Sequence, residues 1–233
     1  MNWGGLTVRM VGGTDGAGGG TGKVVVLLHG YGAPGDDLVG LAGELGGHGS
    51  APARFLFPAA PLSLPAEYGA GRAWWHIDMV RLQMAMLSGQ TRDMTREVPE
   101  GLEAARTKVV GMLQEARREL ALGDAPIWLG GFSQGAMLAC DVALRGTEPL
   151  AGLAVMSGTL LCEEEWLPLM QKRKGLRALV SHGQQDALLP FAIAERLHQE
   201  LAAAGMAVTW VPFSGGHGIA PAVLEALAGL LLA

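Results

Sequence analysis

The stretch Ile127-Trp128-Leu129-Gly130-Gly131-Phe132-Ser133-Gln134-Gly135-Ala136-Met137-Leu138 decides the fold. Its apolar start, 127–129, predicts a short buried strand, and 134–144 predicts a helix. Between them, residues 131–135 match G-x-S-x-G, the pattern of a serine held on a sharp strand-to-helix turn. The bare pattern is weak in a chain with 36 glycines. The strand before it and the helix after it give it weight.

Ser133 is therefore the candidate nucleophile. A serine hydroxyl is a poor nucleophile unless it is exposed and held beside a base. Gly131 and Gly135 relieve crowding around the turn, and the N-terminus of a helix favours negative charge nearby. The alternative interpretation is a serine that merely caps the helix.

Apolar runs on both sides of this stretch extend the same pattern. Strands are expected at 6–11, 24–28, 54–57, 153–156, 178–180 and 208–211. Helices are expected from Asp36 or Asp37, as N-cap, to Leu45, and at 100–122, 191–204 and 219–232. Strands that alternate with helices indicate an α/β protein with a mostly parallel, doubly wound sheet covered on both faces. At 233 residues, a single domain over 1–233 is expected.

His217 is the strongest of six histidines for the role of general base. It lies in Ser214-Gly215-Gly216-His217-Gly218, between the last predicted strand and the last predicted helix. It is also last in the chain order Ser, Asp, His. His29 and His182, each at the end of a strand, are expected to hold loops by hydrogen bonds.

The acid that orients the base is expected on a loop between Ser133 and His217. Asp186 fits, since it follows the 178–180 strand. Asp141 lies inside the 134–144 helix and is expected to face solvent. The role of Asp186 would be to fix the imidazole tautomer and stabilise the imidazolium.

Backbone N–H groups that stabilise a tetrahedral oxyanion are expected at two places. One is Gln134, directly after the nucleophile. The other is Tyr31, in the loop His29-Gly30-Tyr31-Gly32 that follows the 24–28 strand. An ordinary glycine turn is the competing interpretation of that loop.

Four motifs together resemble the carboxylesterase/phospholipase family that includes the acyl-protein thioesterases. They are Leu28-His29-Gly30-Tyr31-Gly32, the 131–135 motif, His182-Gly183 with Asp186 and Pro190, and Gly216-His217. The resemblance runs from about residue 23 to the C-terminus. It implies an α/β-hydrolase fold without a large cap domain, acting on small to medium acyl esters or thioesters without metal or cofactor. It also implies Ser133, Asp186 and His217 as the catalytic residues, with Tyr31 and Gln134 as the oxyanion donors.

Residues 59–95 depart from a regular pattern and predict a groove or lid-like insertion. Trp74, Trp75 and His76 are expected to line the substrate groove, together with Leu188 beside the acid. The Met-rich part, 79–95, is expected to form a lid or groove wall, with core filler as the alternative. The glycine-rich segment 12–22 is expected to be a flexible loop.

Composition excludes several classes. With 17 Lys and Arg against 22 Asp and Glu, the chain offers no nucleic-acid footprint, and Lys172-Arg173-Lys174 is expected to be a solvated turn. No secretory signal and no apolar run of about 20 residues is present, so stable membrane insertion is not expected and a cytoplasmic location is. The two cysteines have no metal-site spacing. An apolar groove at Trp74 and Trp75 could also support a homodimer.

Three hypotheses remain open from the sequence. The first is an esterase or thioesterase that works through an acyl-enzyme on Ser133. The second is an acyltransferase with the same triad, and the third is a non-catalytic binding protein on the same fold.

Overall fold

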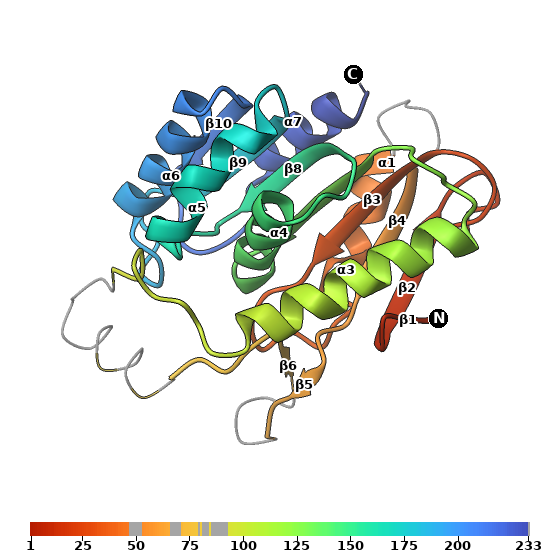
Figure 1. Ribbon diagram of the computed structural model, residues 1–233, viewed down its shortest axis with the longest axis horizontal. Coiled ribbons are helices and arrows are strands. Elements are labelled where there is room, and N and C mark those ends of the chain that lie inside the picture. The colour runs from red at the N-terminus through yellow and green to blue at the C-terminus, as the bar shows by residue number, and fades with distance from the viewer. Residues whose placement is uncertain (47–52, 66–70, 79, 81–83, 85–92, 233) are drawn as a thin grey trace.

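The computed structural model describes residues 1–46, 53–65, 71–78, 80, 84 and 93–232 (Figure 1). Among these, eight strands form one sheet in the order β1-β2-β4-β3-β7-β8-β9-β10. Only the β1/β2 and β2/β4 pairs are antiparallel. The strands are β1 (Asn2–Trp3), β2 (Leu6–Gly12), β3 (Lys23–Leu28), β4 (Ala53–Pro58), β7 (Ile127–Phe132), β8 (Leu150–Met156), β9 (Arg177–Gly183) and β10 (Ala207–Phe213). The mostly parallel α/β-hydrolase sheet is confirmed.

Helices cover both faces of the sheet, as a run of strand residues that are buried throughout requires. Within β3, Val24, Val26 and Leu28 pack into one core cluster, and Val25 and Leu27 pack into the other. The first cluster lies under α3 (Leu102–Glu119), α4 (Gln134–Arg145), α5 (Glu163–Met170) and α6 (Phe191–Ala203). The second lies under α1 (Leu41–Gly46) and α7 (Pro221–Leu232), on the far side of the sheet in Figure 1.

The expected cap of the first helix is wrong in its details. Asp36 occupies the N-cap position, but its side chain makes no capping hydrogen bond. A short 3₁₀ helix, η1 (Asp37–Gly40), comes first and leads directly into α1. The chain therefore enters this helix through a tighter turn than the sequence suggested.

The glycine-rich segment 12–22 is folded back on itself by hydrogen bonds. The Asp15 carboxylate accepts the N–H of Ala17 at 2.9 Å and of Gly19 at 2.8 Å. Gly13 N–H donates to the carbonyl of Ala53, at the start of β4. The segment thus lies against the amino end of β4, and its flexibility stays a prediction.

Residues 59–95 contain a small antiparallel pair, β5 (Leu62–Ser63) and β6 (Arg72–Ala73). Most of the expected lid, 79–95, lies outside the described residues. Of its described side chains, Met94 is buried in the core, whereas Val80 and Met84 are exposed.

The expectation that Asp141 faces solvent is wrong. All of Gln134–Leu144 is buried, so α4 is enclosed by the sheet and by its neighbouring helices, and Asp141 has no solvent-facing side on which to lie. Its carboxylate is instead paired inside the protein.

Both cysteines, Cys140 and Cys162, are free thiols and are buried. In the part of the chain that the structure describes, no helix has both the length and the apolar character required to cross a bilayer.

Candidate active site

Ser133 lies in the tight turn between β7 and α4. Its backbone has φ 53° and ψ −117°, a region that side chains rarely occupy and that persists only where the surroundings enforce it. Two glycines make the turn possible. A Cβ on Gly135 would stand 2.1 Å from the Leu28 carbonyl oxygen, and one on Gly131 would stand 2.5 Å from the same atom. The spacing in the sequence therefore has a steric cause.

A chain of hydrogen bonds joins Ser133 to two residues far away in the sequence. Ser133 Oγ lies 2.8 Å from His217 Nε2, and His217 Nδ1 lies 2.7 Å from Asp186 Oδ2. Because a carboxylate only accepts, Nδ1–H is the donor to Asp186, which leaves Nε2 to accept the serine proton. The imidazole also packs on Phe132, with ring centroids 4.9 Å apart. The three residues occupy the carboxyl ends of β7, β9 and β10, where such sheets bind ligands.

The Asp186 side chain is fully buried, and both of its oxygens are occupied. Oδ1 accepts the N–H groups of Leu188 and Leu189 at 2.8 and 3.0 Å. Oδ2 faces His217 and also lies 3.2 Å from His182 Nε2. Burial alone would raise the pKa of Asp186, but the hydrogen bonds from His182, His217 and the Leu189 amide outweigh it and lower the pKa well below its usual range. The carboxylate is therefore charged at neutral pH.

His182 has a larger part in this arrangement than the loop-holding role expected of it. Its Nε2 contacts the Leu189 carbonyl at 2.9 Å as well as Asp186. The ring thus fixes the 183–189 loop and the carboxylate together. The other strand-end histidine behaves as expected: His29 bonds the Gly30 carbonyl and accepts the N–H of Ala60.

The loop with Tyr31 is hydrogen-bonded to β6. Gly32 N–H donates to the Arg72 carbonyl at 2.9 Å, and Arg72 N–H donates to the Ala33 carbonyl at 2.8 Å. Gln134 is the first residue of α4, where backbone N–H groups have no partner within the helix. Tyr31 is half-buried. The two predicted oxyanion donors thus follow β3 and β7, which are neighbours in the sheet.

Comparison with known proteins identifies the family. Residues 18–231 match the phospholipase/carboxylesterase family. The chain belongs to this family. It is accordingly a hydrolase of the esterase or thioesterase type, and the described residues show no large cap on its α/β-hydrolase fold.

Individual members of the family are distant in sequence. The chain is 25% identical to acyl-protein thioesterase 1 of Gibberella zeae over 76% of its own length and 75% of that protein. It is 29% identical to acyl-protein thioesterase 1 of Eremothecium gossypii, over 75% and 70%. Among solved structures, esterase PE8 superimposes with a TM-score of 0.78 at 28% identity, covering 97% of each chain.

The hydrogen bonds that join Gln134 to the tryptophan segment could not be predicted from the sequence. The Gln134 side chain accepts the N–H of Trp74 at 2.9 Å and donates to the carbonyl of Trp75 at 2.9 Å. The Trp74 indole donates to the His29 carbonyl. The tryptophan segment thereby ties the residue after the nucleophile to the loop that contains Tyr31. The partners lie about 60 residues apart, so no spacing rule reveals them.

The four residues predicted to line a substrate groove have different environments. Trp74 and Trp75 are only 2% and 1% exposed and belong to the core. Both contact the Gln134 side chain through their backbone, and their role in a substrate groove stays a prediction. His76 is exposed. Leu188 is half-buried and donates its N–H to Asp186, so it lies directly beside the triad.

The described part of the chain was also compared with the requirements of a metal site. No group of three or more His, Cys, Asp or Glu side chains that could hold a metal ion occurs among the described residues.

Proposed function

We propose that the chain hydrolyses carboxylic esters or thioesters of small to medium acyl groups through an acyl-enzyme on Ser133. The observation that carries the proposal is the unbroken hydrogen-bond chain from Ser133 through His217 to a buried, charged Asp186. The strained turn at Ser133, at the N-terminus of α4, supports it further.

The three hydrogen-bonded residues have distinct roles in the proposed reaction. His217 Nε2 takes the proton of Ser133 as Oγ attacks the acyl carbonyl, and the imidazolium then protonates the departing alcohol or thiol. Water enters, gives its proton to the same nitrogen, and attacks the acyl-enzyme. The imidazolium then returns the proton to Ser133 Oγ as the bond to the acyl group breaks and the acid is released. Asp186 stays ionised throughout and stabilises the imidazolium that forms at each step.

The tetrahedral intermediates need donors aimed at the developing oxyanion. We assign these to the backbone N–H groups of Gln134 and Tyr31. The support is their position at the ends of adjacent strands and the double link from the Gln134 side chain to the tryptophan segment. That link restrains the residue after the nucleophile, so its N–H needs little rearrangement when charge develops.

Labelling tests the nucleophile. A fluorophosphonate is expected to modify one site per chain, Ser133, and Ser133→Ala is expected to lose both labelling and turnover of p-nitrophenyl esters. Ser63→Ala, at an exposed serine on β5, is the matched control and should keep both. Turnover that survives in Ser133→Ala would disprove the assignment.

Substrate class is tested separately. A series of p-nitrophenyl esters and acyl thioesters of increasing chain length is expected to show an optimum at small to medium acyl groups. The thioester part of the proposal draws on the relatives named acyl-protein thioesterase 1. Activity on esters with none on thioesters would remove that part and leave the mechanism intact.

A further inference from the structure

A cavity lies at the opposite end of the sheet from Ser133. It has a volume of about 440 Å³ and is lined by residues at or beside the amino ends of β3, β4, β7, β8 and β9. The six residues of β7 run from this cavity to the nucleophile, about 20 Å at a rise of about 3.3 Å per residue. The cavity is therefore separate from the ester site and is not used by the proposed mechanism.

Arg54 gives this cavity its chemical character. The residue is only 6% exposed, yet its Nε is buried without a hydrogen-bond partner. No carboxylate or carbonyl accepts a bond from its guanidinium within the described residues. A buried, unpaired donor on a charged group is costly, and native proteins rarely keep one without a reason. The indole Nε1 of Trp128, which lines the same cavity, is also buried without a partner.

Two more cations line the cavity, and each has donors to spare. Lys23 Nζ donates to the Leu231 carbonyl at 2.6 Å, which uses one of its three protons. Arg177 Nη1 contacts the Leu230 carbonyl at 3.3 Å, and its Cζ lies 5.3 Å from the centre of the Trp128 ring. Among the described residues, the lining includes three cationic side chains and no Asp or Glu.

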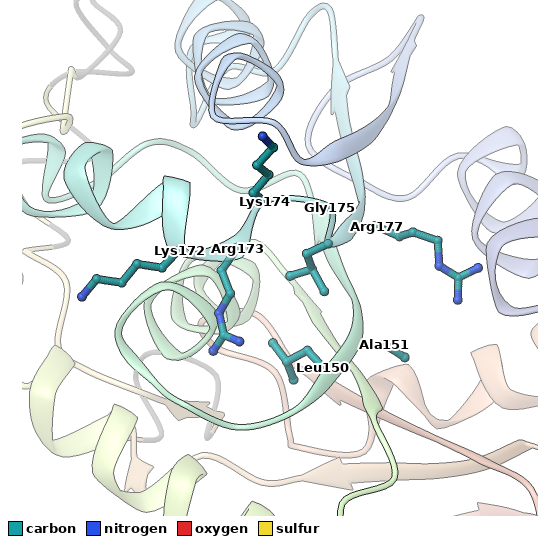
Figure 2. A pocket seen from close by; sticks show the side chains of 8 residues that line it. Leu150, Ala151, Lys172, Arg173, Lys174, Gly175 and Arg177 are labelled. Carbon is teal, nitrogen blue, oxygen red and sulfur yellow. The ribbon is translucent and has the colours of Figure 1, made fainter.

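The neighbouring basic pocket, drawn in Figure 2, is a useful contrast. It is about 330 Å³ and contains Lys172, Arg173 and Lys174, the run expected to be a solvated turn. Figure 2 shows Lys172, Lys174 and Arg177 pointing away from one another. Arg173 already donates to the carbonyls of Ala143, Gly146 and Glu148. The lysines of this pocket point apart and Arg173 is already bonded to three carbonyls, so the pocket carries no ligand proposal.

We propose that the cavity at Arg54 binds a small phosphate-bearing anion. A guanidinium matches a phosphate with two parallel hydrogen bonds, and Lys23 and Arg177, which line the same cavity, add positive charge to it. The volume accommodates a small phosphate monoester. The glycine-rich segment borders the site, because Gly22 lines the cavity and Gly13 is bonded to Ala53.

Inorganic phosphate is the probe, titrated by calorimetry at constant ionic strength. Saturable binding is expected, weakened at least about tenfold by Arg54→Met and partly restored by Arg54→Lys, because a charged hydrogen bond is removed and then replaced. Lys172→Met removes the same charge from the neighbouring pocket and should bind phosphate like the wild type. Ser133→Ala should also bind normally, which separates this site from the proposed ester chemistry.

Three outcomes would overturn the proposal: no saturable binding, equal weakening by Arg54→Met and Lys172→Met, or binding of succinate but not of glycerol phosphate. If Arg54→Met does not fold, hydrogen–deuterium exchange of the wild type decides. Phosphate is expected to protect amides in 12–23 and 53–57 and to leave 131–135 unchanged, and protection at 131–135 alone would place the anion in the ester site instead.

Discussion

Asp186 and Asp141 are both aspartates with fully buried side chains, yet their surroundings differ in kind. Asp186 has two imidazoles and two backbone amides as partners. Asp141 accepts Arg106 Nη1 and Arg145 Nε, both at 2.6 Å, and the indole N–H of Trp166 at 2.9 Å. The first lies on a loop at the carboxyl end of the sheet, and the second joins α3, α4 and α5.

This difference in partners suggests how a catalytic carboxylate can be told from a structural one when both are buried. Arginine is charged at all relevant pH values, so the charge of Asp141 is permanently neutralised within its cluster. Histidine changes its charge near neutral pH, so the charge of Asp186 can meet an imidazolium when the reaction creates one. Burial is the same in both, and we propose that the type of partner decides the role.

Asp186→Asn would test the chemical side of this contrast with the largest expected effect. An amide keeps the shape of the carboxylate, but it has one oxygen acceptor and one N–H donor in place of two acceptors. The tautomer of His217 is then no longer fixed. We expect kcat for ester hydrolysis to fall about 10⁴-fold, the size seen for such a change in other triads, with KM little altered. Steady-state kinetics on a p-nitrophenyl ester measures both. A loss below about tenfold would mean that Asp186 does not orient the base.

Asp141→Asn would test the structural side. The change leaves Arg106 and Arg145 near each other without their shared anion, which should lower the free energy of unfolding by about 3 kcal/mol. Urea denaturation followed by circular dichroism measures it. Asp124→Asn, at an exposed residue, is the matched control and should stay within about 0.5 kcal/mol of the wild type. If Asp141→Asn instead lost activity without losing stability, the division between the two carboxylates would be wrong.

The same two residues show what the sequence can predict. Asp186 could be proposed because position after a strand and chain order follow from the fold class. The prediction that Asp141 faces solvent is wrong because it gives the 134–144 helix a solvent-facing side, although this segment is apolar on all sides. Arg145, four residues on, was a visible partner, but Arg106 and Trp166 lie 35 and 25 residues away. Local pattern thus predicts elements and strand-end residues, whereas side-chain partners across helices depend on packing that no spacing encodes.

His182→Gln would test how much the single donor His182 Nε2 contributes to holding Asp186. Glutamine reaches the same region as Nε2 but holds Asp186 Oδ2 less firmly, so kcat is expected to fall about tenfold, as for loss of a hydrogen bond to a charged group. Removing that donor is also expected to raise the pKa of Asp186, because one of the hydrogen bonds that lower it is lost. His198→Gln, at a ring stacked on Trp210 with centroids 5.0 Å apart, is the control. Steady-state kinetics on a p-nitrophenyl ester measures kcat, and an unchanged kcat with a lower melting temperature would reduce His182 to a purely structural residue.

Acid stability provides the smallest effect and the one most specific to Asp186. Its pKa in the folded protein lies below the unfolded value of about 3.9, so it stabilises the fold above about pH 4, and that stabilisation is lost as pH falls toward the folded pKa. The melting temperature of the wild type should therefore drop more between pH 5 and pH 3 than that of Asp186→Asn, which has no proton to take up there. Other carboxylates titrate in both proteins and cancel in the comparison, and Asp124→Asn should follow the wild type. Parallel curves for the wild type and Asp186→Asn would mean that the two imidazoles do not favour the charged carboxylate, and the distinction from Asp141 would lose its electrostatic basis.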